Sequence, residues 1–327
     1  MEILMGIDGG GTHTRAAAAD TRGRLLSLVK RQGGAFLYKD ANANENVRQT
    51  VLAAAAAAGC GLGDVAALAA GIAGYDRKKD LRWVRKLTKI PGLHCPGRSC
   101  PMQHVNDAVV AHRGALLFEP GIVAIAGTGS VVAGITEKGK FIRNYDFRHY
   151  ANNAACNLTY YSVEKILAGE TDGTDFADRL LRYFGAEDIA ALKALRKKDF
   201  GMGSAQRMKL FGDFAPAVTQ AALDGSRLAG EICARAAEET VEGIRLLGEG
   251  FAPSPVPVAL VGSVANSAFM KSAVAALLRE ERNARYALVE PALPPVLGAV
   301  LMAARLAKIE AEPFQKNLIA SYPAKGA

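Results

Sequence analysis

The sequence predicts an α/β protein built from two duplicated domains. Its 327 residues exceed what one hydrophobic core usually supports, so two domains are expected. Residues 3–19 and 121–134 share one pattern, an apolar run, a glycine-rich polar turn and a second apolar run. This pattern is typical of strand, tight turn and strand. A polar turn ending in glycine and a further strand-like run follow each copy, so both halves open with the same three-stranded meander.

The first glycine-rich turn has the composition of a phosphate-binding loop. It reads Asp8-Gly9-Gly10-Gly11-Thr12-His13. Glycines allow a positive φ and leave the backbone amides open to a polyphosphate, while an aspartate holds Mg²⁺ through water. No Gly-Lys-Ser/Thr follows, which excludes a Walker A loop, and the strand-like run that follows argues against a Rossmann fingerprint. An ordinary hairpin turn is the alternative interpretation of this segment alone.

The second copy favours the phosphate-binding interpretation. Residues 121–134 read Gly-Ile-Val-Ala-Ile-Ala-Gly-Thr-Gly-Ser-Val-Val-Ala-Gly. We expect the duplicated domains to face each other across a cleft, so that two opposed turns hold one polyphosphate from both sides.

The remaining elements follow from apolar periodicity and from glycine and proline positions. In the first half we expect strands at about 2–7, 14–19, 25–30, 65–72 and just before His104, and helices at about 43–59, 77–89 and 107–117. In the second half we expect helices at about 159–168, 174–184, 187–196, 204–224, 227–248 and from Ser267, with strands at about 256–261 and 286–289. A last helix is expected at about 297–310, and the tail after Pro313 carries no clear signal.

Asp107 is the candidate for chemistry outside the glycine turns. Val105-Asn106-Asp107-Ala108 follows a short predicted strand and opens a predicted helix, which places a carboxylate at the end of a strand. The alternative is a helix N-cap, a position where aspartate is favoured.

Six segments together resemble the BadF/BadG/BcrA/BcrD ATPase family, which includes N-acetylglucosamine kinases, within the sugar kinase, heat-shock protein and actin superfamily. They are Asp8–Thr12, Gly71–Gly74, Val105–Ala108, Ala126–Ser130, Gly262–Asn266 and Gly298-Ala299. The resemblance implies two ribonuclease H-like domains, the actin-like ATPase fold, around an interdomain nucleotide cleft. It further implies domains at 1–117 and 118–296, with a C-terminal helix at about 297–327 that packs back on the first.

The resemblance also implies the roles of individual residues. Asp107 is the general base that takes the proton of the acceptor hydroxyl during γ-phosphoryl transfer from ATP with Mg²⁺. The nucleotide is expected to contact Asp8, Gly9, Gly10, Gly11, Thr12, His13, Gly127, Thr128, Gly129, Ser130, Gly262, Ser263 and Asn266, with Asp8 holding the Mg²⁺ through water. The acceptor is expected near Gly74, Asn106, Thr128, Asn152 and Asn153. His13 adds positive charge if protonated or faces outward, and Asn266 caps a helix or meets ribose.

Two departures from the family pattern limit the assignment of the acceptor. Phe36 stands where related kinases tend to have an asparagine that meets the sugar. The position of a family aspartate that holds sugar hydroxyls falls near Ala155, and Asp146, Asn152 or Asn153 are candidate substitutes at a different offset. We therefore expect an acceptor other than plain N-acetylglucosamine.

Composition excludes several other classes of protein. The net charge is +8, and its densest basic segment is 77–89. The three-residue spacing of Leu81, Val84 and Leu87 predicts an amphipathic helix there with its charged side chains on the solvent face, which argues against a nucleic-acid-binding motif. The five cysteines (60, 95, 100, 156 and 233) and five histidines lack the spacing of a metal site, including Cys95 and Cys100. We expect no membrane span, no leader peptide and a cytoplasmic location. Relatives suggest a homodimer.

Two functions remain open from the sequence. The first is a kinase for the hydroxyl of an amino sugar or related molecule. The second is an ATPase that couples domain closure to a partner protein, as reductase and dehydratase activators do. A ligand-sensing regulator is a weaker third interpretation, since no helix-turn-helix precedes the first glycine turn.

Overall fold

The computed structural model describes residues 1–36, 40–93, 100–252 and 255–323. The chain divides into two compact units. Unit 1 comprises Met1–Pro120 and Glu290–Ala327, and unit 2 comprises Gly121–Val289. The chain thus leaves unit 1 once and returns to it.

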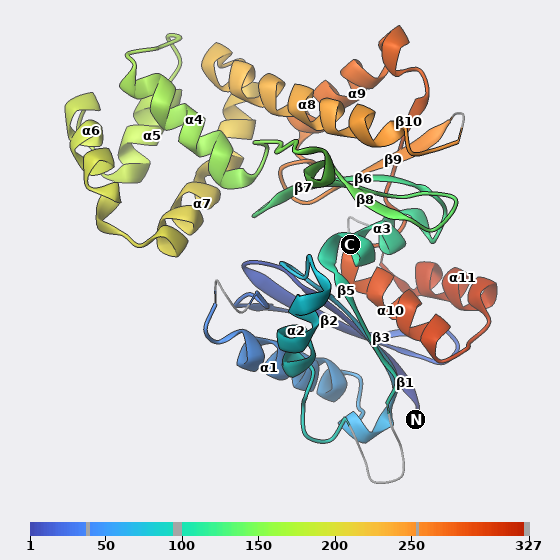
Figure 1. The fold of residues 1–327 in the computed structure, drawn as a ribbon. Coiled ribbons are helices and arrows are strands. Elements are labelled where there is room, and N and C mark those ends of the chain that lie inside the picture. The colour runs from blue at the N-terminus through green and yellow to red at the C-terminus, as the bar shows by residue number, and fades with distance from the viewer. Residues whose placement is uncertain (37–39, 94–99, 253–254, 324–327) are drawn as a thin grey trace. The chain divides into compact units, whose positions relative to one another are not determined.

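Unit 1 is built on a five-stranded mixed sheet with the order β3-β2-β1-β4-β5 (Figure 1). Its strands are β1 (Ile3–Gly9), β2 (His13–Asp20), β3 (Leu25–Gln32), β4 (Val65–Ile72) and β5 (Met102–Asn106). The first three form an antiparallel meander, whereas β4 and β5 run parallel to β1. The carboxyl ends of β1, β4 and β5 therefore meet at one edge of the sheet.

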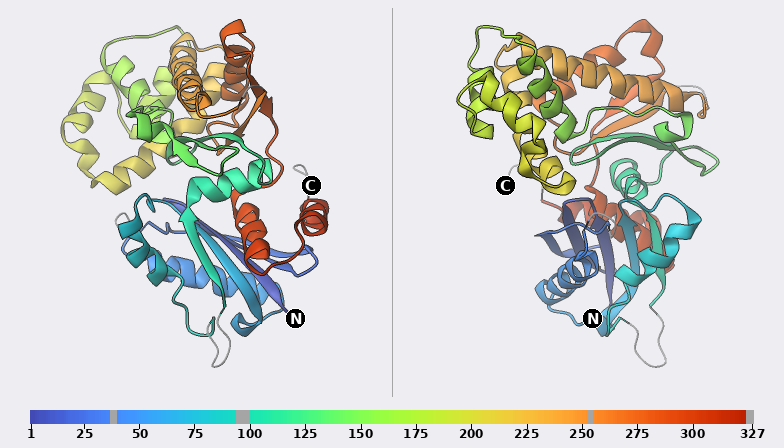
Figure 2. Two further views of the ribbon diagram at one scale, coloured as in Figure 1. Left: turned by 45° about the vertical axis from the view of Figure 1, so that its right-hand side comes forward. Right: turned by 60° about the vertical axis from the view of Figure 1, so that its left-hand side comes forward.

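Helices cover both faces of this sheet, because β1 is buried along its whole length and needs apolar partners on each side. One face packs against α1 (Ala43–Ala57) and α2 (Leu81–Leu87), and the other packs against α3 (Asp107–Leu116), α10 (Pro295–Leu306) and α11 (Ala311–Ser321). Figure 2 shows α1 and α10 on opposite sides of the strands. The returning segment thus completes the core of unit 1.

Unit 2 repeats the same sheet topology, with the order β10-β9-β6-β7-β8. Here β6 (Gly121–Ala126), β7 (Ser130–Ile135) and β8 (Phe141–Arg143) form the antiparallel meander. Strands β9 (Val256–Val261) and β10 (Tyr286–Val289) lie parallel to β6. The two meanders predicted from the glycine-rich copies are therefore confirmed, each at the start of a mixed sheet.

The helices of unit 2 fall into two groups (Figure 1). Helix α8 (Arg227–Gly248) packs on β6 and β7 and against α9 (Ala268–Leu278). The other helices are inserted between β8 and α8 and form a group of their own, α4 (Ala155–Leu167), α5 (Phe176–Phe184), α6 (Ile189–Lys197) and α7 (Ser204–Leu223). Phe176, Phe211 and Phe214 are buried among them.

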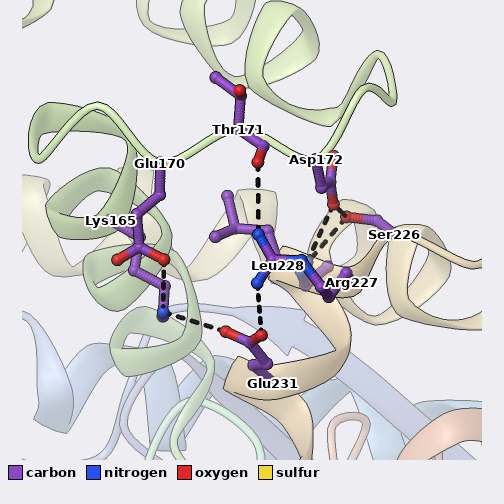
Figure 3. A network of polar contacts seen from close by, with 9 residues as sticks. Lys165, Glu170, Thr171, Asp172, Ser226, Arg227, Leu228 and Glu231 are labelled. Carbon is purple, nitrogen blue, oxygen red and sulfur yellow. Dashed lines mark hydrogen bonds and ion pairs between the residues drawn. The ribbon is translucent and has the colours of Figure 1, made fainter.

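A polar network fastens the inserted helices to the start of α8 (Figure 3). The carboxylate of Asp172 accepts hydrogen bonds from Ser226 Oγ at 2.6 Å and from the backbone amide of Leu228 at 2.9 Å. Beside it, Lys165 pairs with Glu170 and Glu231, and Arg227 also binds Glu231. Burial would raise the pKa of Asp172, but the hydrogen bonds from Ser226, Thr174 and Leu228 outweigh it and hold the pKa well below its usual range. The Asp172 carboxylate thus satisfies the Leu228 amide, one of the backbone amides at the α8 N-terminus that lack a partner within the helix.

Several element predictions were wrong. Strand β5 includes His104 instead of ending before it, and the C-terminal helix expected at about 297–327 is two helices, α10 and α11. Residues 311–321, which carry no clear sequence signal, form α11, because Phe314 and Leu318 lie one turn apart and are fully or almost fully buried on unit 1. Pro313 is tolerated there because it lies in the first turn of the helix. Helix α4 begins at Ala155, four residues before the expected 159.

Candidate functional site

The first glycine turn is held in place by a second loop of unit 1. The backbone amide of Ala35 donates to the carbonyl of Gly10 at 3.0 Å, and that of Gly33 donates to the carbonyl of Thr12 at 2.9 Å. A Cβ on Gly34 would lie 2.4 Å from the carbonyl oxygen of Gly11. The carbonyls of the turn are therefore bound to protein, while Gly11 itself is exposed.

Asp8 forms an ion pair that the sequence analysis missed. Its register partner across the β1–β2 hairpin is Arg15, whose Nη1 lies 3.1 Å from Asp8 Oδ2. Asp8 is 7% exposed, and its pKa is raised because desolvation outweighs the charge and hydrogen bond of Arg15. The signal was available, because residues flanking a hairpin turn at equal distance face each other.

Asp107 is the first residue of α3, and the N-cap is Asn106. The side-chain oxygen of Asn106 accepts from the amide of Ala108 at 3.0 Å, while its Nδ2 donates to the carbonyl of Tyr75 and to Asp76 Oδ1. The alternative that Asp107 is the helix cap is therefore wrong. Asn106 performs that task and also joins the end of β5 to the loop after β4.

Asp107 lies in a negative environment. Burial raises its pKa to about 7, and the negative charges of Asp8 and Asp76 add to this effect. Strand β4 lies between β1 and β5, so the carboxyl ends of β1 and β5 are about 10 Å apart. The fold thus brings Asp8 and Asp107 to the same sheet edge.

Gly74 lies in the loop after β4 and has a φ of +77°. A Cβ at this position would meet the ring of Phe36 at 2.5 Å, so glycine is required by both backbone and packing. The amide of Ala73 donates to the carbonyl of Gly9 at 2.8 Å, which ties this loop to the end of β1. The Phe36 ring also lies near Trp83, with centroids 5.9 Å apart. An apolar contact therefore occupies the place where the resemblance implies a polar one.

The second glycine turn joins β6 to β7 and is supported from two sides within unit 2. The amide of Ala155, at the start of α4, donates to the carbonyl of Gly127 at 2.7 Å. Ser130 Oγ donates to the carbonyl of Ala151 at 2.8 Å, so this hydroxyl is bound to protein. A Cβ on Gly129 would meet no described atom within 4 Å. Ala155 thus supports the turn through its backbone.

Gly262 and Asn266 shape the turn after β9. Gly262 has a φ of +100°, and a Cβ there would lie 2.3 Å from the carbonyl oxygen of Ala126. Asn266 Nδ2 donates to the carbonyls of Leu260 and Gly262 at 3.1 and 3.0 Å. Ser263 is near the second glycine turn, since its backbone nitrogen lies 3.8 Å from the position of a Cβ on Gly127. The structure therefore groups Gly127 with Gly262, Ser263 and Asn266.

Asn152 and Asn153 are bound to α8. The amide of Asn152 donates to Glu239, and Asn153 Nδ2 donates to Thr240 Oγ1. Asn153 is 1% exposed and its Oδ1 has no hydrogen-bond partner within the described ranges. Asn153 is therefore placed in the interior of unit 2, whereas Asn152 is only partly buried.

The profile of the BadF/BadG/BcrA/BcrD ATPase family matches residues 5–303 of this chain. The chain belongs to this family. Both glycine turns, the segments around Asp107 and Gly262 and most of α10 lie within the matched range.

One curated relative is the N-acetylmuramic acid/N-acetylglucosamine kinase of Clostridium acetobutylicum. It is 28% identical over 151 residues, which is 46% of this chain and 47% of the relative. The match thus spans about half the length of that enzyme.

Solved structures share the fold of this family member. A candidate N-acetylglucosamine kinase of Chromobacterium violaceum aligns with a TM-score of 0.71 at 22% identity, covering 93% of this chain and 99% of that one. A candidate N-acetylglucosamine kinase of Porphyromonas gingivalis gives 0.69 at 17%, covering 92% and 99%. The ROK family glucokinase of Streptomyces griseus, solved with glucose and AMPPNP, gives 0.61 at 20%, covering 94% and 99%. The actin-like ATPase fold with two domains is confirmed.

The described residues of this family member contain no group of three or more His, Cys, Asp or Glu arranged to hold a metal ion. Cys60, Cys100, Cys156 and Cys233 form no disulfide with one another, and Cys95 lies outside the described residues. None of the described helices is long and apolar enough to cross a membrane.

Proposed function

We propose that this protein is an ATP-dependent kinase that transfers the γ-phosphoryl group to a hydroxyl of an amino sugar or related small molecule. The observation that carries the proposal is the position of Asp107, a half-buried carboxylate at the same sheet edge as Asp8 and the first glycine turn. Its pKa of about 7 suits a general base near neutral pH. Family membership and the kinase relative support the same reaction.

In this proposal Asp107 accepts the proton of the acceptor hydroxyl as that oxygen attacks the γ-phosphorus. The bond from the γ-phosphorus to the β–γ bridging oxygen breaks, and ADP leaves with that oxygen. The amides of Gly9 and Gly11 and the Thr12 hydroxyl bind phosphate oxygens, as do the amides of Thr128 to Ser130 and the Thr128 hydroxyl. The amides of Gly10 and Gly127 are not assigned to the nucleotide, because they donate to the carbonyls of His13 and Gly129 at 3.1 and 2.9 Å. Because Ser130 Oγ already donates to Ala151, its amide is the group assigned to the nucleotide.

A magnesium ion is part of this proposal. Mg²⁺ is commonly held by one or two carboxylates together with water and substrate phosphates, and Asp8 is a nearly buried carboxylate in β1 beside the first glycine turn. Asp8 would hold it through water, with Arg15 fixing the carboxylate. When bound, the ion neutralises charge on the phosphates.

The acceptor is proposed to differ from plain N-acetylglucosamine. Phe36 packs between Gly74 and Trp83, and Ala155 supplies only a backbone amide to the second turn. Gly74, Asn106 and Asn152 remain candidate acceptor contacts, whereas Asn153 is suited to positioning because it is buried. A cytoplasmic location and a homodimer are further parts of the proposal.

The test is ATP turnover with Mg²⁺ against N-acetylated and free amino sugars, muramic acid derivatives and simple hexoses, with an acceptor-free control. ADP release that requires one acceptor class and disappears in Asp107→Asn supports the kinase. ADP release that no sugar changes would favour a partner-coupled ATPase instead. Asp107→Asn should retain ATP affinity within a few-fold, and a large loss of ATP binding would contradict its role as base.

A further inference from the structure

A pocket of about 510 Å³ lies in unit 1 between α2 and the edge strand β5, outside the residues assigned to the proposed reaction. Its volume falls in the range of roughly 300–1,000 Å³ that small-molecule sites occupy. The described residues that line it are Tyr75, Leu81, Arg85, Thr88, Lys89, Cys100, Met102, Gln103 and His104.

The charge of this pocket is positive. Arg85 and Lys89 are both exposed, and neither has an ion-pair partner within the described part of the chain. No aspartate or glutamate is among the described lining residues. Two unpaired cations four residues apart, one of them an arginine, supply the kind of charge that binds a phosphate group.

His104 shows that the positive charge acts on the pocket itself. Its Nε2 lies 2.7 Å from Thr88 Oγ1, and burial together with the nearby charge of Arg85 lowers its pKa to about 4. His104 is therefore neutral near pH 7 and adds no positive charge of its own to the pocket. Thr88, Gln103 and Tyr75 add groups that form hydrogen bonds, while Leu81 and Met102 provide apolar surface.

We propose that this pocket binds a phosphomonoester of a small organic molecule, with Arg85 and Lys89 binding the phosphate and Leu81 and Met102 contacting the carbon skeleton. A free phosphate ion is much smaller than the pocket, so the organic part contributes affinity. The sole tryptophan of the chain, Trp83, lies in α2 two residues before Arg85 and is 7% exposed, which makes its fluorescence a local readout.

The experiment titrates the whole protein, without ATP, with glucose 6-phosphate, inorganic phosphate and glucose, by calorimetry and Trp83 fluorescence. Two double variants remove the same charge from the same segment. Arg85→Gln/Lys89→Gln changes the lining residues, and Arg82→Gln/Lys86→Gln changes exposed cations that do not line the pocket. We expect glucose 6-phosphate to bind at least tenfold more tightly than phosphate or glucose. The first variant should weaken it at least tenfold and the second less than twofold.

Three results would overturn the proposal. The first is no binding of glucose 6-phosphate to the wild type. The second is an equal loss of affinity in both double variants, which would indicate general electrostatic attraction. The third is unchanged affinity in Arg85→Gln/Lys89→Gln, which would place the ligand elsewhere. Circular dichroism checks that each variant is folded, and Lys89→Gln alone provides a milder second variant. Because no turnover is measured, the result is independent of the kinase assay.

Discussion

Replacement of Gly129 by valine tests whether this position requires glycine for nucleotide binding or for folding. At the first glycine turn, Gly9 and the Gly34 that packs on the turn are fixed by close packing. A Cβ on Gly129 meets no described atom within 4 Å, and the φ of Gly129 lies outside the left-handed region. The fold of unit 2 therefore does not need glycine at this position. If the turn binds nucleotide phosphates, a branched side chain on Gly129 blocks the approach to the backbone amides.

The expected magnitude follows from the hydrogen bonds lost. A hydrogen bond to a charged group contributes about 1.5–3 kcal/mol, and about 1.4 kcal/mol corresponds to a tenfold change in Kd. Gly129→Val should therefore raise the Kd for ATP at least tenfold. The midpoint of thermal unfolding of this variant should stay within about 2 °C of the wild type. Replacing a glycine at a compatible position changes the free energy of unfolding by only about 0.4–1 kcal/mol, because it reduces the conformational entropy of the unfolded chain.

Gly262→Ala is the matched control, because its effect is expected on folding. The residue has a φ of +100°, and the new Cβ would lie 2.3 Å from the carbonyl of Ala126. A left-handed backbone conformation at a non-glycine residue and overpacking each destabilise a protein by about 1–3 kcal/mol. The midpoint of thermal unfolding of Gly262→Ala should therefore fall by several degrees. Calorimetric titration with a non-hydrolysable ATP analogue and thermal unfolding measure both variants. Unchanged nucleotide affinity in Gly129→Val would refute the assignment of this turn.

Three further predictions concern titration and packing. The rate of phosphoryl transfer should rise with pH through about 7, because Asp107 acts as a base only when ionised. Asp76→Asn should move this rise in rate to lower pH, because it removes a negative charge that raises the pKa of Asp107. An unshifted pH–rate profile in Asp76→Asn would contradict the effect of Asp76 on Asp107. Asp172→Asn should destabilise the protein by about 1–3 kcal/mol in urea unfolding. Folding lowers the pKa of Asp172, so the stability that its carboxylate contributes is fully present above its unfolded pKa of about 3.9. That stability is lost as the pH falls through the folded pKa, and the free-energy difference between wild type and Asp172→Asn should therefore shrink below about pH 4. A difference that stays constant with pH would argue against a role of the charge. Asn266→Ala should lower the unfolding midpoint even without nucleotide, because Leu260 and Gly262 lose their side-chain donor, and an effect seen only with ATP present would instead indicate a ligand contact.

Local pattern was sufficient for most elements of this chain. Strand β4 matches the expected 65–72, and α8 matches 227–248, because each has strong apolar periodicity and clear end signals. Apolar pattern alone did not predict α11, because two buried residues one turn apart give too weak a periodicity in isolation, and the resemblance implied one continuous C-terminal helix instead of two. The surface of unit 1 that buries Phe314 and Leu318 is formed by residues far away in the chain.

The sequence by itself determined the two meanders, the glycine turns and the placement of Asp107 at a strand end, because glycine content, alternation and strand length act over a few residues. Tertiary structure alone decided which polar groups the fold already uses. Asn106 caps α3, Ser130 Oγ is bound to Ala151, Asn266 holds its own turn, and Arg15 pairs with Asp8. It also decided the pKa of Asp107, since burial and the charges of Asp8 and Asp76 depend on strands that meet only in the folded sheet.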